Sequence, residues 1–168
     1  MCIFIATVAS YSLLALLPAD STGVNSIQGS PEKGGCKVLE KRLEADDPAF
    51  DDSVFRFYYN KTLNKCFDDL VKKDEENAYN RLHECVTACQ TGQGAPRCVK
   101  TQTSDCSRGD DCDIFYFYDV DSETCKPFNT TYANYVQNAH ENIFLRERYC
   151  QNDCSGFTKD DVCGTKNN

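Results

Sequence analysis

Cysteine is the residue that most constrains this chain, because it occurs twelve times in 168 residues. Such a density is typical of small extracellular domains, which use cysteines in disulfides, and not of intracellular proteins. Zinc sites usually take their ligands from C-x2-C pairs and H-x3-H arms, and the chain has neither. Its closest cysteine pairs, Cys85/Cys89 and Cys150/Cys154, have C-x3-C spacing. The cysteines therefore predict a disulfide framework, and we expect no metal and no cofactor.

The N-terminal end of the chain predicts secretion. An uncharged apolar run, MCIFIATVASYSLLALLP, ends at Pro18 and is followed by the small residues Ala19, Ser21 and Gly23. This pattern is typical of a secretory signal peptide, although no Lys or Arg precedes the run. A membrane anchor is the less favoured alternative, since polar residues interrupt the run and it is short for a bilayer span. We expect a signal peptide over residues 1–19 and a secreted, extracellular protein without membrane insertion.

Charge and sequons bear on the class of partner. The formal net charge of −8 argues against binding to nucleic acid and to anionic membrane surfaces, and it favours basic partners. Two N-x-[ST] sequons, at Asn60 and Asn129, predict a glycoprotein with sugars on its surface.

The chain contains one pattern twice. FRFYYNKTLNKC ends at Cys66 and IFYFYDVDSETC ends at Cys125, each with an aromatic cluster before the turn. An Asn-x-aromatic triplet then precedes the next cysteine, as NAY before Cys85 and NIF before Cys150, and each copy closes with C-x3-C. The repeat and the Gly- and Pro-containing stretch between its copies predict a flexible segment at 20–35, module 1 at 36–89, a linker at 90–97, module 2 at 98–154 and a tail at 155–168.

Within each copy, the local pattern predicts a hairpin and a helix. Aromatic clusters bounded by Asn or Asp are typical of β-strands that enter a turn. EENAYNRLHECVTAC is expected to be helical, with both cysteines of the C-x3-C pair on one face. A module this small is not held together by core burial alone, and two bridges from the helix would each contribute roughly 3–4 kcal/mol. We therefore expect a small disulfide-rich α+β fold.

Together these features resemble the Kunitz domain, the fold of pancreatic trypsin inhibitor. The match rests on F-x-Y-N-x5-C in the hairpin, N-x-[FY] before the helix, the closing C-x3-C, and Arg56 at a position where the family commonly has Arg. Two acidic modules after a signal peptide are most similar to salivary proteins of blood-feeding ticks. The resemblance implies a secreted serine-type endopeptidase inhibitor that impairs host haemostasis. It also implies a twisted hairpin and a C-terminal helix in each module, and the bridges Cys36–Cys89, Cys66–Cys85, Cys98–Cys154 and Cys125–Cys150.

The chain departs from the family at the reactive loop. A third disulfide usually clamps that loop to the segment after the hairpin, but FDDLVKKDEEN and KPFNTTYANYVQNAHEN contain neither cysteine nor glycine. Counting back from the hairpin aromatics places Asp51 and Asp52 at the reactive position of module 1, and Asp110 and Asp111 at that of module 2. Counting forward from the first cysteine gives Asp46. Trypsin-like enzymes prefer Arg there, so we expect no simple inhibition of their active sites.

The stretch CSRGDDC offers an alternative function. It places Arg108, Gly109 and Asp110 between Cys106 and Cys112, on the loop that would protrude from module 2. A disulfide between the two cysteines would reduce the entropy lost on binding. In an integrin, the guanidinium would pair with a carboxylate and the Asp carboxylate would ligate a divalent cation. The alternatives are an integrin antagonist that blocks platelet aggregation and an ordinary polar turn that chance has produced.

Removal of the signal peptide leaves an odd number of cysteines. If Cys106 bridges Cys112, then Cys163 is the candidate unpaired thiol, and it could form an intermolecular disulfide. Bridges from Cys163 to Cys106 or to Cys112 remain alternatives.

An enzyme is not predicted. The two histidines, His83 and His140, fall in separate modules, and the sequence shows no nucleophile elbow, phosphate loop or paired catalytic carboxylates. We therefore assign no catalytic residues. The partner is expected to be a host serine protease or a platelet integrin.

Overall fold

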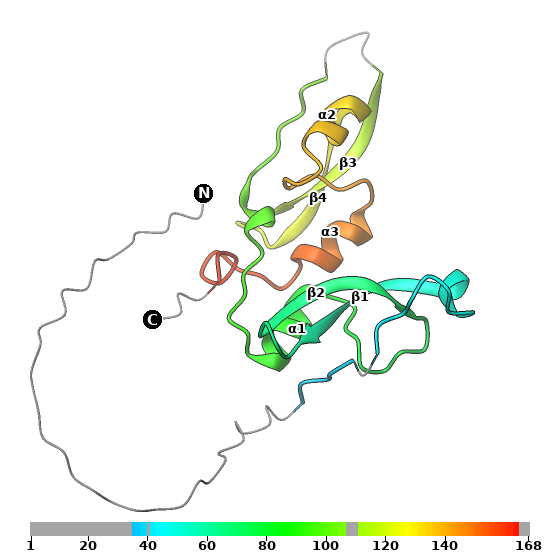
Figure 1. The fold of residues 1–168 in the computed structure, drawn as a ribbon. Coiled ribbons are helices and arrows are strands. Elements are labelled where there is room, and N and C mark those ends of the chain that lie inside the picture. Colours follow the sequence, from blue (N-terminus) through cyan, green and yellow to red (C-terminus); the bar gives the residue numbers. More distant parts are fainter. Residues whose placement is uncertain (1–34, 40, 107–110, 165–168) are drawn as a thin grey trace, which may run out of the picture.

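The computed structural model describes residues 35–39, 41–106 and 111–164 of the chain. These residues form two separate two-stranded antiparallel sheets and several short helices (Figure 1). In chain order, the elements are η1 (Phe50–Asp52), β1 (Ser53–Asn60), β2 (Lys65–Lys72), α1 (Leu82–Cys89), η2 (Pro96–Val99), β3 (Cys112–Asp119), β4 (Thr124–Thr131), α2 (Tyr132–Gln137) and α3 (Glu147–Cys154). The expected class, a small disulfide-rich α+β fold, is confirmed at this level.

The two hairpins have the same register relative to their cysteines. Tyr59 pairs with Cys66 in the first hairpin, and Tyr118 pairs with Cys125 in the second. Tight reversal of the chain requires a left-handed residue in each turn, Asn64 at φ 49° in one and Glu123 at φ 55° in the other. Each hairpin cysteine lies on the second strand of its hairpin and is bonded to the helix of the same module.

Five disulfides join described cysteines. Four of them are the pairs that the family resemblance implies, and the fifth closes the short loop between Cys106 and Cys112; the pairs are Cys36–Cys89, Cys66–Cys85, Cys98–Cys154, Cys125–Cys150 and Cys106–Cys112. Cysteines four residues apart leave the same side of a helix. Each helix is therefore fixed both to its hairpin and to the N-terminal segment of its module.

The structure bears on Cys163 only for the full chain. There, Cys163 is disulfide-bonded, so it is not a free thiol. The expectation of an unpaired or intermolecular Cys163 concerns the chain after removal of residues 1–19, and it stays a prediction.

The segment before each C-terminal helix pairs with the outer edge of its hairpin. Phe57 exchanges two backbone hydrogen bonds with Tyr79, at 2.9 and 2.8 Å, and Tyr116 exchanges two with Phe144, both at 2.8 Å. Each hairpin thus gains a short third strand segment, formed by the aromatic residue of the Asn-x-aromatic triplet. This pairing explains why the triplet stands at the same distance from the cysteine in both copies.

The asparagines of the two triplets behave differently. The Asn142 side chain is fully buried, and its amide nitrogen donates to the carbonyls of Cys98, Lys100 and Tyr118 while its oxygen accepts from the Tyr118 N–H. In module 1, Asn77 is half-buried. There, the Tyr79 hydroxyl accepts from the Lys37 N–H at 2.7 Å and attaches the N-terminal segment instead.

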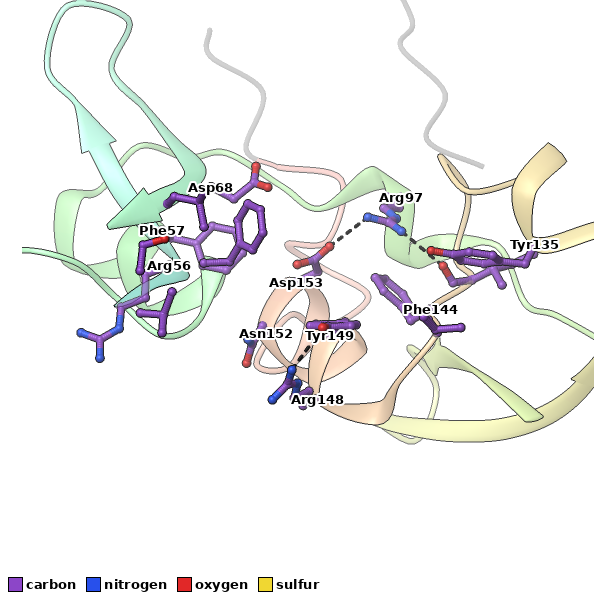
Figure 2. Close-up of a pocket in the computed structure, with 16 residues that line it drawn as sticks. Arg56, Phe57, Asp68, Arg97, Tyr135, Phe144, Arg148, Tyr149, Asn152 and Asp153 are labelled. Atoms are coloured by element: carbon purple, nitrogen blue, oxygen red, sulfur yellow. Dashed lines mark hydrogen bonds and ion pairs between the residues drawn. The ribbon is translucent and has the colours of Figure 1, made fainter. Parts of the chain in front are cut away.

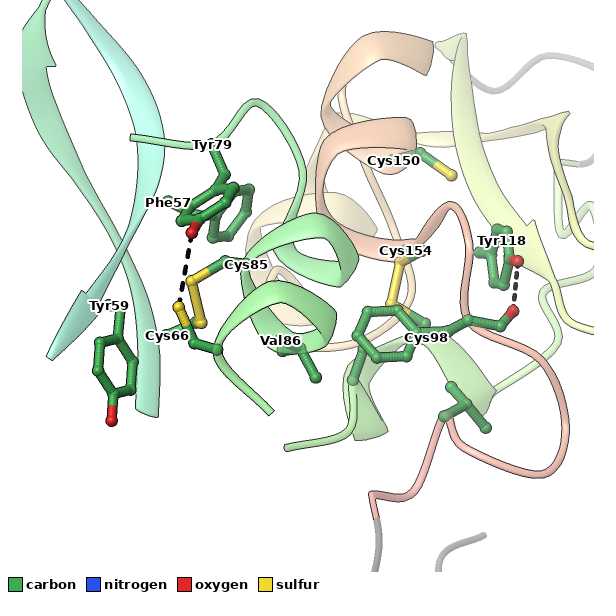
Figure 3. Packing of buried hydrophobic residues seen from close by; sticks show 14 of the residues in the cluster. Phe57, Tyr59, Cys66, Tyr79, Cys85, Val86, Cys98, Tyr118, Cys150 and Cys154 are labelled. Atoms are coloured by element: carbon green, nitrogen blue, oxygen red, sulfur yellow. Dashed lines mark hydrogen bonds between the residues drawn. A yellow bond between two sulfur atoms is a disulfide. The ribbon is translucent and has the colours of Figure 1, made fainter. Parts of the chain in front are cut away.

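One hydrophobic core extends through both modules (Figure 3). Helices α1 and α3 pack against each other, and the four disulfides that join these helices to the rest of their modules lie in the same cluster. Its buried members are Phe57, Tyr59, Cys66, Tyr79, Cys85, Val86, Cys89, Ala95, Cys98, Tyr118, Phe144, Cys150, Cys154, Phe157 and Val162. A smaller cluster of Phe115, Phe117, Phe128 and Ile143 lies on the other face of the second hairpin. The two modules are therefore joined by shared burial as well as by the linker.

Residues after α3 complete this shared core. Phe157 is 1% exposed, its ring meets that of His83 edge-on at 4.9 Å, and its carbonyl accepts from the Tyr118 hydroxyl at 2.6 Å. Close packing continues at the linker, where an added Cβ on Gly94 would lie 2.1 Å from the Gly164 nitrogen. Among the described residues, no helix is long and apolar enough to span a bilayer.

Candidate binding loops and the groove between the modules

The loop before β1 presents exposed carboxylates. Asp51 and Asp52 form part of η1, directly before the strand, and both side chains are exposed, as is that of Asp46. The Asp52 carboxylate lies 3.9 Å from the Lys73 ammonium, and the side chains of this pair are 83% and 70% exposed. A pair so exposed contributes little, so the acidic residues remain available to a partner.

A side-chain pair anchors this loop to the second strand of its hairpin. The Arg42 Nε donates to the Asp69 carboxylate on β2 at 2.6 Å, and the guanidinium lies 5.8 Å from the centre of the Tyr58 ring. The contact with Asp69 raises the pKa of Arg42 above its ordinary value. The anchor stands where the sequence lacks the expected loop disulfide.

The loop before β3 is anchored in another way. The Ser104 hydroxyl accepts from the Asn129 N–H at 3.1 Å, and the Asp105 N–H donates to the Asn129 carbonyl at 3.3 Å. The Asp105 carboxylate accepts from the Asn134 amide on α2 at 3.0 Å. One residue further on, the Cys106–Cys112 disulfide closes the loop. The base of the loop is thus fixed to β4, to α2 and to the start of β3.

The residues of the tripeptide itself lie outside the described part of the chain. Arg108, Gly109 and Asp110 fall in the range 107–110, so the structure leaves their predicted role as a prediction. Asp111, the next residue after the tripeptide, is exposed.

Helix α2 was missed by the sequence analysis. It lacks an apolar stripe, because Tyr132 and Val136 are exposed, and only Tyr135 packs inward, stacked on Phe115 with the ring centres 5.1 Å apart. The available signal was the cap: Thr131 accepts from the backbone N–H of Asn134 at 3.2 Å, and Thr is a preferred N-cap residue.

A groove of about 610 Å³ lies between the modules (Figure 2). On one side it is lined by β1, including Phe55 and Arg56, and on the other by α3 and the residues before it, including Leu145 and Tyr149. Phe55, Leu145 and Tyr149 are exposed apolar residues. The volume lies in the range of small-molecule sites.

Two of the charged groups that line the groove, Arg97 and Asp153, contact each other. The Arg97 guanidinium contacts the Asp153 carboxylate at 3.0 Å, donates to the carbonyls of Glu141, Ala139 and Ile143, and lies 4.3 Å from the centre of the Phe144 ring. These bonds tie η2 to module 2 and leave the guanidinium with little capacity for another ligand.

Asp153 has an unusual pKa. Burial raises the pKa of this carboxyl to about 6, the Arg97 guanidinium opposes the rise, and the carboxylate of Asp68 across the groove adds to it. A perturbed carboxyl in a cleft is often functional. Here the Arg97 contact accounts for its position, and we assign Asp153 a structural role in holding η2 to α3.

The remaining predicted residues lie at the surface of the hairpins or on α1. Asn60 ends β1 and is half-buried, and Asn129 is exposed on β4. Their glycosylation stays a prediction. His83 lies 3.8 Å from the Asp161 carboxylate and packs on Phe157. Within the described ranges, no group of three or more His, Cys, Asp and Glu side chains is arranged to hold a metal ion.

Comparison with known proteins adds little at the level of the fold. No family model and no curated protein sequence matches the chain. A solved structure described as "Structure of the complex between SmCI and human carboxypeptidase A4" is similar over 70% of this chain and 61% of that chain, with 16% identity and a TM-score of 0.25. The chain therefore spans less than two thirds of that neighbour, and a TM-score this low does not establish a shared fold. The class follows from the observed fold, a small disulfide-rich α+β protein of two hairpin-and-helix units.

Proposed function

We propose that this protein is a secreted, non-enzymatic inhibitor of the Kunitz type, directed at a serine protease of host haemostasis. The observation that carries the proposal is the anchored loop in front of each hairpin. In both modules a loop between the first cysteine and the first strand is held at its base and carries exposed residues. A loop held in one conformation loses less entropy on binding, which is what an inhibitor of this kind requires.

The acidic residues of the loops determine the mode of inhibition. A trypsin-like specificity pocket contains an aspartate, so Asp51 or Asp52 would meet like charge there. The same side chains are complementary to a basic surface outside the active site, and such complementarity raises association rates at low salt. The inhibitor would then block large substrates while leaving the active site open to small ones.

The test compares small and large substrates. We expect trypsin and thrombin to turn over a small chromogenic substrate at unchanged rates, and thrombin to cleave fibrinogen more slowly, with the effect lost at high salt. Asp51→Asn/Asp52→Asn should weaken this inhibition about tenfold, since two complementary charges are removed. Asp160→Asn, at another exposed carboxylate, is the matched control. Stoichiometric inhibition of trypsin on the small substrate would show that the reactive positions are wrongly assigned.

A second candidate function is an integrin antagonist, and the observation that favours it is the Cys106–Cys112 disulfide. This bridge closes a ring around Arg108, Gly109 and Asp110. A short ring restricts the tripeptide before binding and so reduces the entropy that binding costs.

For this candidate, the carboxylate of Asp110 is the decisive group. We expect the mature protein to block platelet aggregation in a manner that depends on divalent cations, and Asp110→Ala to abolish the block because it removes the cation ligand. Asp111→Ala, one residue away and also acidic, should change the potency little. Equal potency of the wild type and Asp110→Ala in the aggregation assay would reduce the tripeptide to a coincidence.

A further inference from the structure

The loop of module 2 is connected to an element that the Kunitz pattern did not predict. Helix α2 follows β4 directly, and its Asn134 contacts Asp105 at the base of the loop. We propose that Asn134 and Asp105 form a hydrogen-bonded clamp that positions the loop of module 2, in place of the loop disulfide that the chain lacks.

Asn134 is itself held in place from several directions. Its amide nitrogen donates to the hydroxyl of Thr130 at 2.8 Å as well as to the Asp105 carboxylate, and Thr130 is fully buried. Its backbone carbonyl accepts from the N–H of Asn138 at 3.0 Å. A side chain fixed in this way presents its second amide hydrogen in one direction, toward Asp105.

Helix α2 has a firm attachment to the hairpin. Tyr135 stacks on Phe115, which is fully buried in the smaller core. The clamp therefore connects the loop, through a short helix, to the packed interior of module 2. A disulfide between the loop and the segment after the hairpin would make the same connection by a covalent bond.

The clamp is supported by two further bonds beside it. Asn129 on β4 donates its N–H to the Ser104 hydroxyl and accepts from the Asp105 N–H. These bonds involve the β4 backbone, so they set the register of residues 104 and 105 along the strand. Asn134 then supplies the only side-chain contact to the Asp105 carboxylate among the bonds found in the described residues. That contact is charge-assisted, which makes it one of the stronger kinds of hydrogen bond.

Module 1 shows the same arrangement with different residues. Arg42 in the loop reaches Asp69 on β2, as Asp105 in the other loop reaches the residues that follow β4. In both modules a pair of polar side chains, one of them a carboxylate, holds the loop to the second strand or to the helix that follows it. The importance of the clamp for binding rests on the proposed function, in which this loop carries the residues that a partner contacts.

The experiment measures how tightly the loop is held, with no partner present. In the oxidised full chain, two rates are followed: amide hydrogen exchange at Asp105, and cleavage by trypsin after Arg108. Asn134→Ala and Asp105→Ala should each raise both rates about tenfold, as expected when a charge-assisted hydrogen bond is lost. Cleavage after Arg42 in module 1 is the internal control and should not change.

Two further variants separate a direct contact from a general loss of structure. In the double variant Asn134→Ala/Asp105→Ala, the exchange and cleavage rates should be no higher than in either single variant, because the two residues act through one bond. The exchange Asn134→Asp/Asp105→Asn reverses donor and acceptor, and it should restore both rates to within about threefold of the wild type. The proposed clamp would be refuted by any of three results. These are additive effects of the two Ala substitutions, rates that stay high in Asn134→Asp/Asp105→Asn, or an equal increase in the cleavage rate after Arg42. Trypsin serves here only to report access to Arg108, and the exchange rate at Asp105 is measured without any protease or integrin. A negative binding assay therefore leaves the exchange result standing, and the reverse also holds.

Discussion

Phe157→Ala is expected to lower the free energy of unfolding by about 3–5 kcal/mol, the range for removing a buried aromatic ring. It should also separate the unfolding of the two modules. The ring is 1% exposed and packs on His83 of α1, while the backbone of the same residue accepts from Tyr118 of β3. The variant would leave a cavity at the point where both modules share their core, so the coupling between them should weaken.

Calorimetry on the oxidised protein measures this effect. The wild type should unfold in one transition, and Phe157→Ala in two transitions at lower temperatures. Phe55→Ala is the matched control, since that ring is 66% exposed, and it should shift the midpoint little. A single transition at an unchanged temperature would show that Phe157 does not couple the modules.

Replacement of both Cys98 and Cys154 by Ala is expected to cause the second large loss of stability. The two cysteines are 1% and 0% exposed and are 56 residues apart in the sequence. The bridge stabilises the protein because it closes a long loop in the unfolded chain and so lowers that chain's entropy. Removing it should lower the free energy of unfolding by about 4 kcal/mol.

The matched control for this prediction is Cys106→Ala/Cys112→Ala, which removes a bridge with a sequence separation of 6. The same relation gives roughly 2 kcal/mol for so short a loop. Urea unfolding under non-reducing conditions should therefore show a larger loss for the first variant. Equal losses would mean that chain entropy does not set the contribution of these bridges.

Much of the fold could be predicted because its signals are local. The aromatic clusters before Cys66 and Cys125 specify strands and turns within a few residues, and the C-x3-C pairs fix which side of each helix faces the hairpin. The sequence also places Asp51 and Asp52 directly before β1, where the structure has them. Each of these features depends on neighbours along the chain.

The features that could not be predicted depend on distant contacts. The triplets at Asn77 and Asn142 look alike in the sequence. Of the two, the Asn142 side chain donates to the backbone carbonyls of Cys98 and Lys100, because module 2 brings these residues within its reach. Phe157 and Val162 stand in a polar segment without periodicity, and their burial depends on the surface that α1 and the linker offer. Packing of this kind is set by the tertiary structure, which overrides local pattern.

The loop anchors could not be predicted for the same reason. Ser104, Asp105, Asn129 and Asn134 are ordinary polar residues in the sequence. Their bonds appear only when β4 turns into α2 beside the loop. A search of the sequence for a disulfide clamp finds nothing, since the connection is made without cysteine.

The shared core also determines the valency of the protein. Two modules on a flexible linker could each find a site independently, and the second contact would gain from a high effective concentration over many geometries. Here α1, α3 and Phe157 hold the modules in one arrangement. A partner can bind both loops at once only if its own two sites match that spacing and angle. The gain in affinity from bivalent binding is therefore restricted to targets of matching geometry.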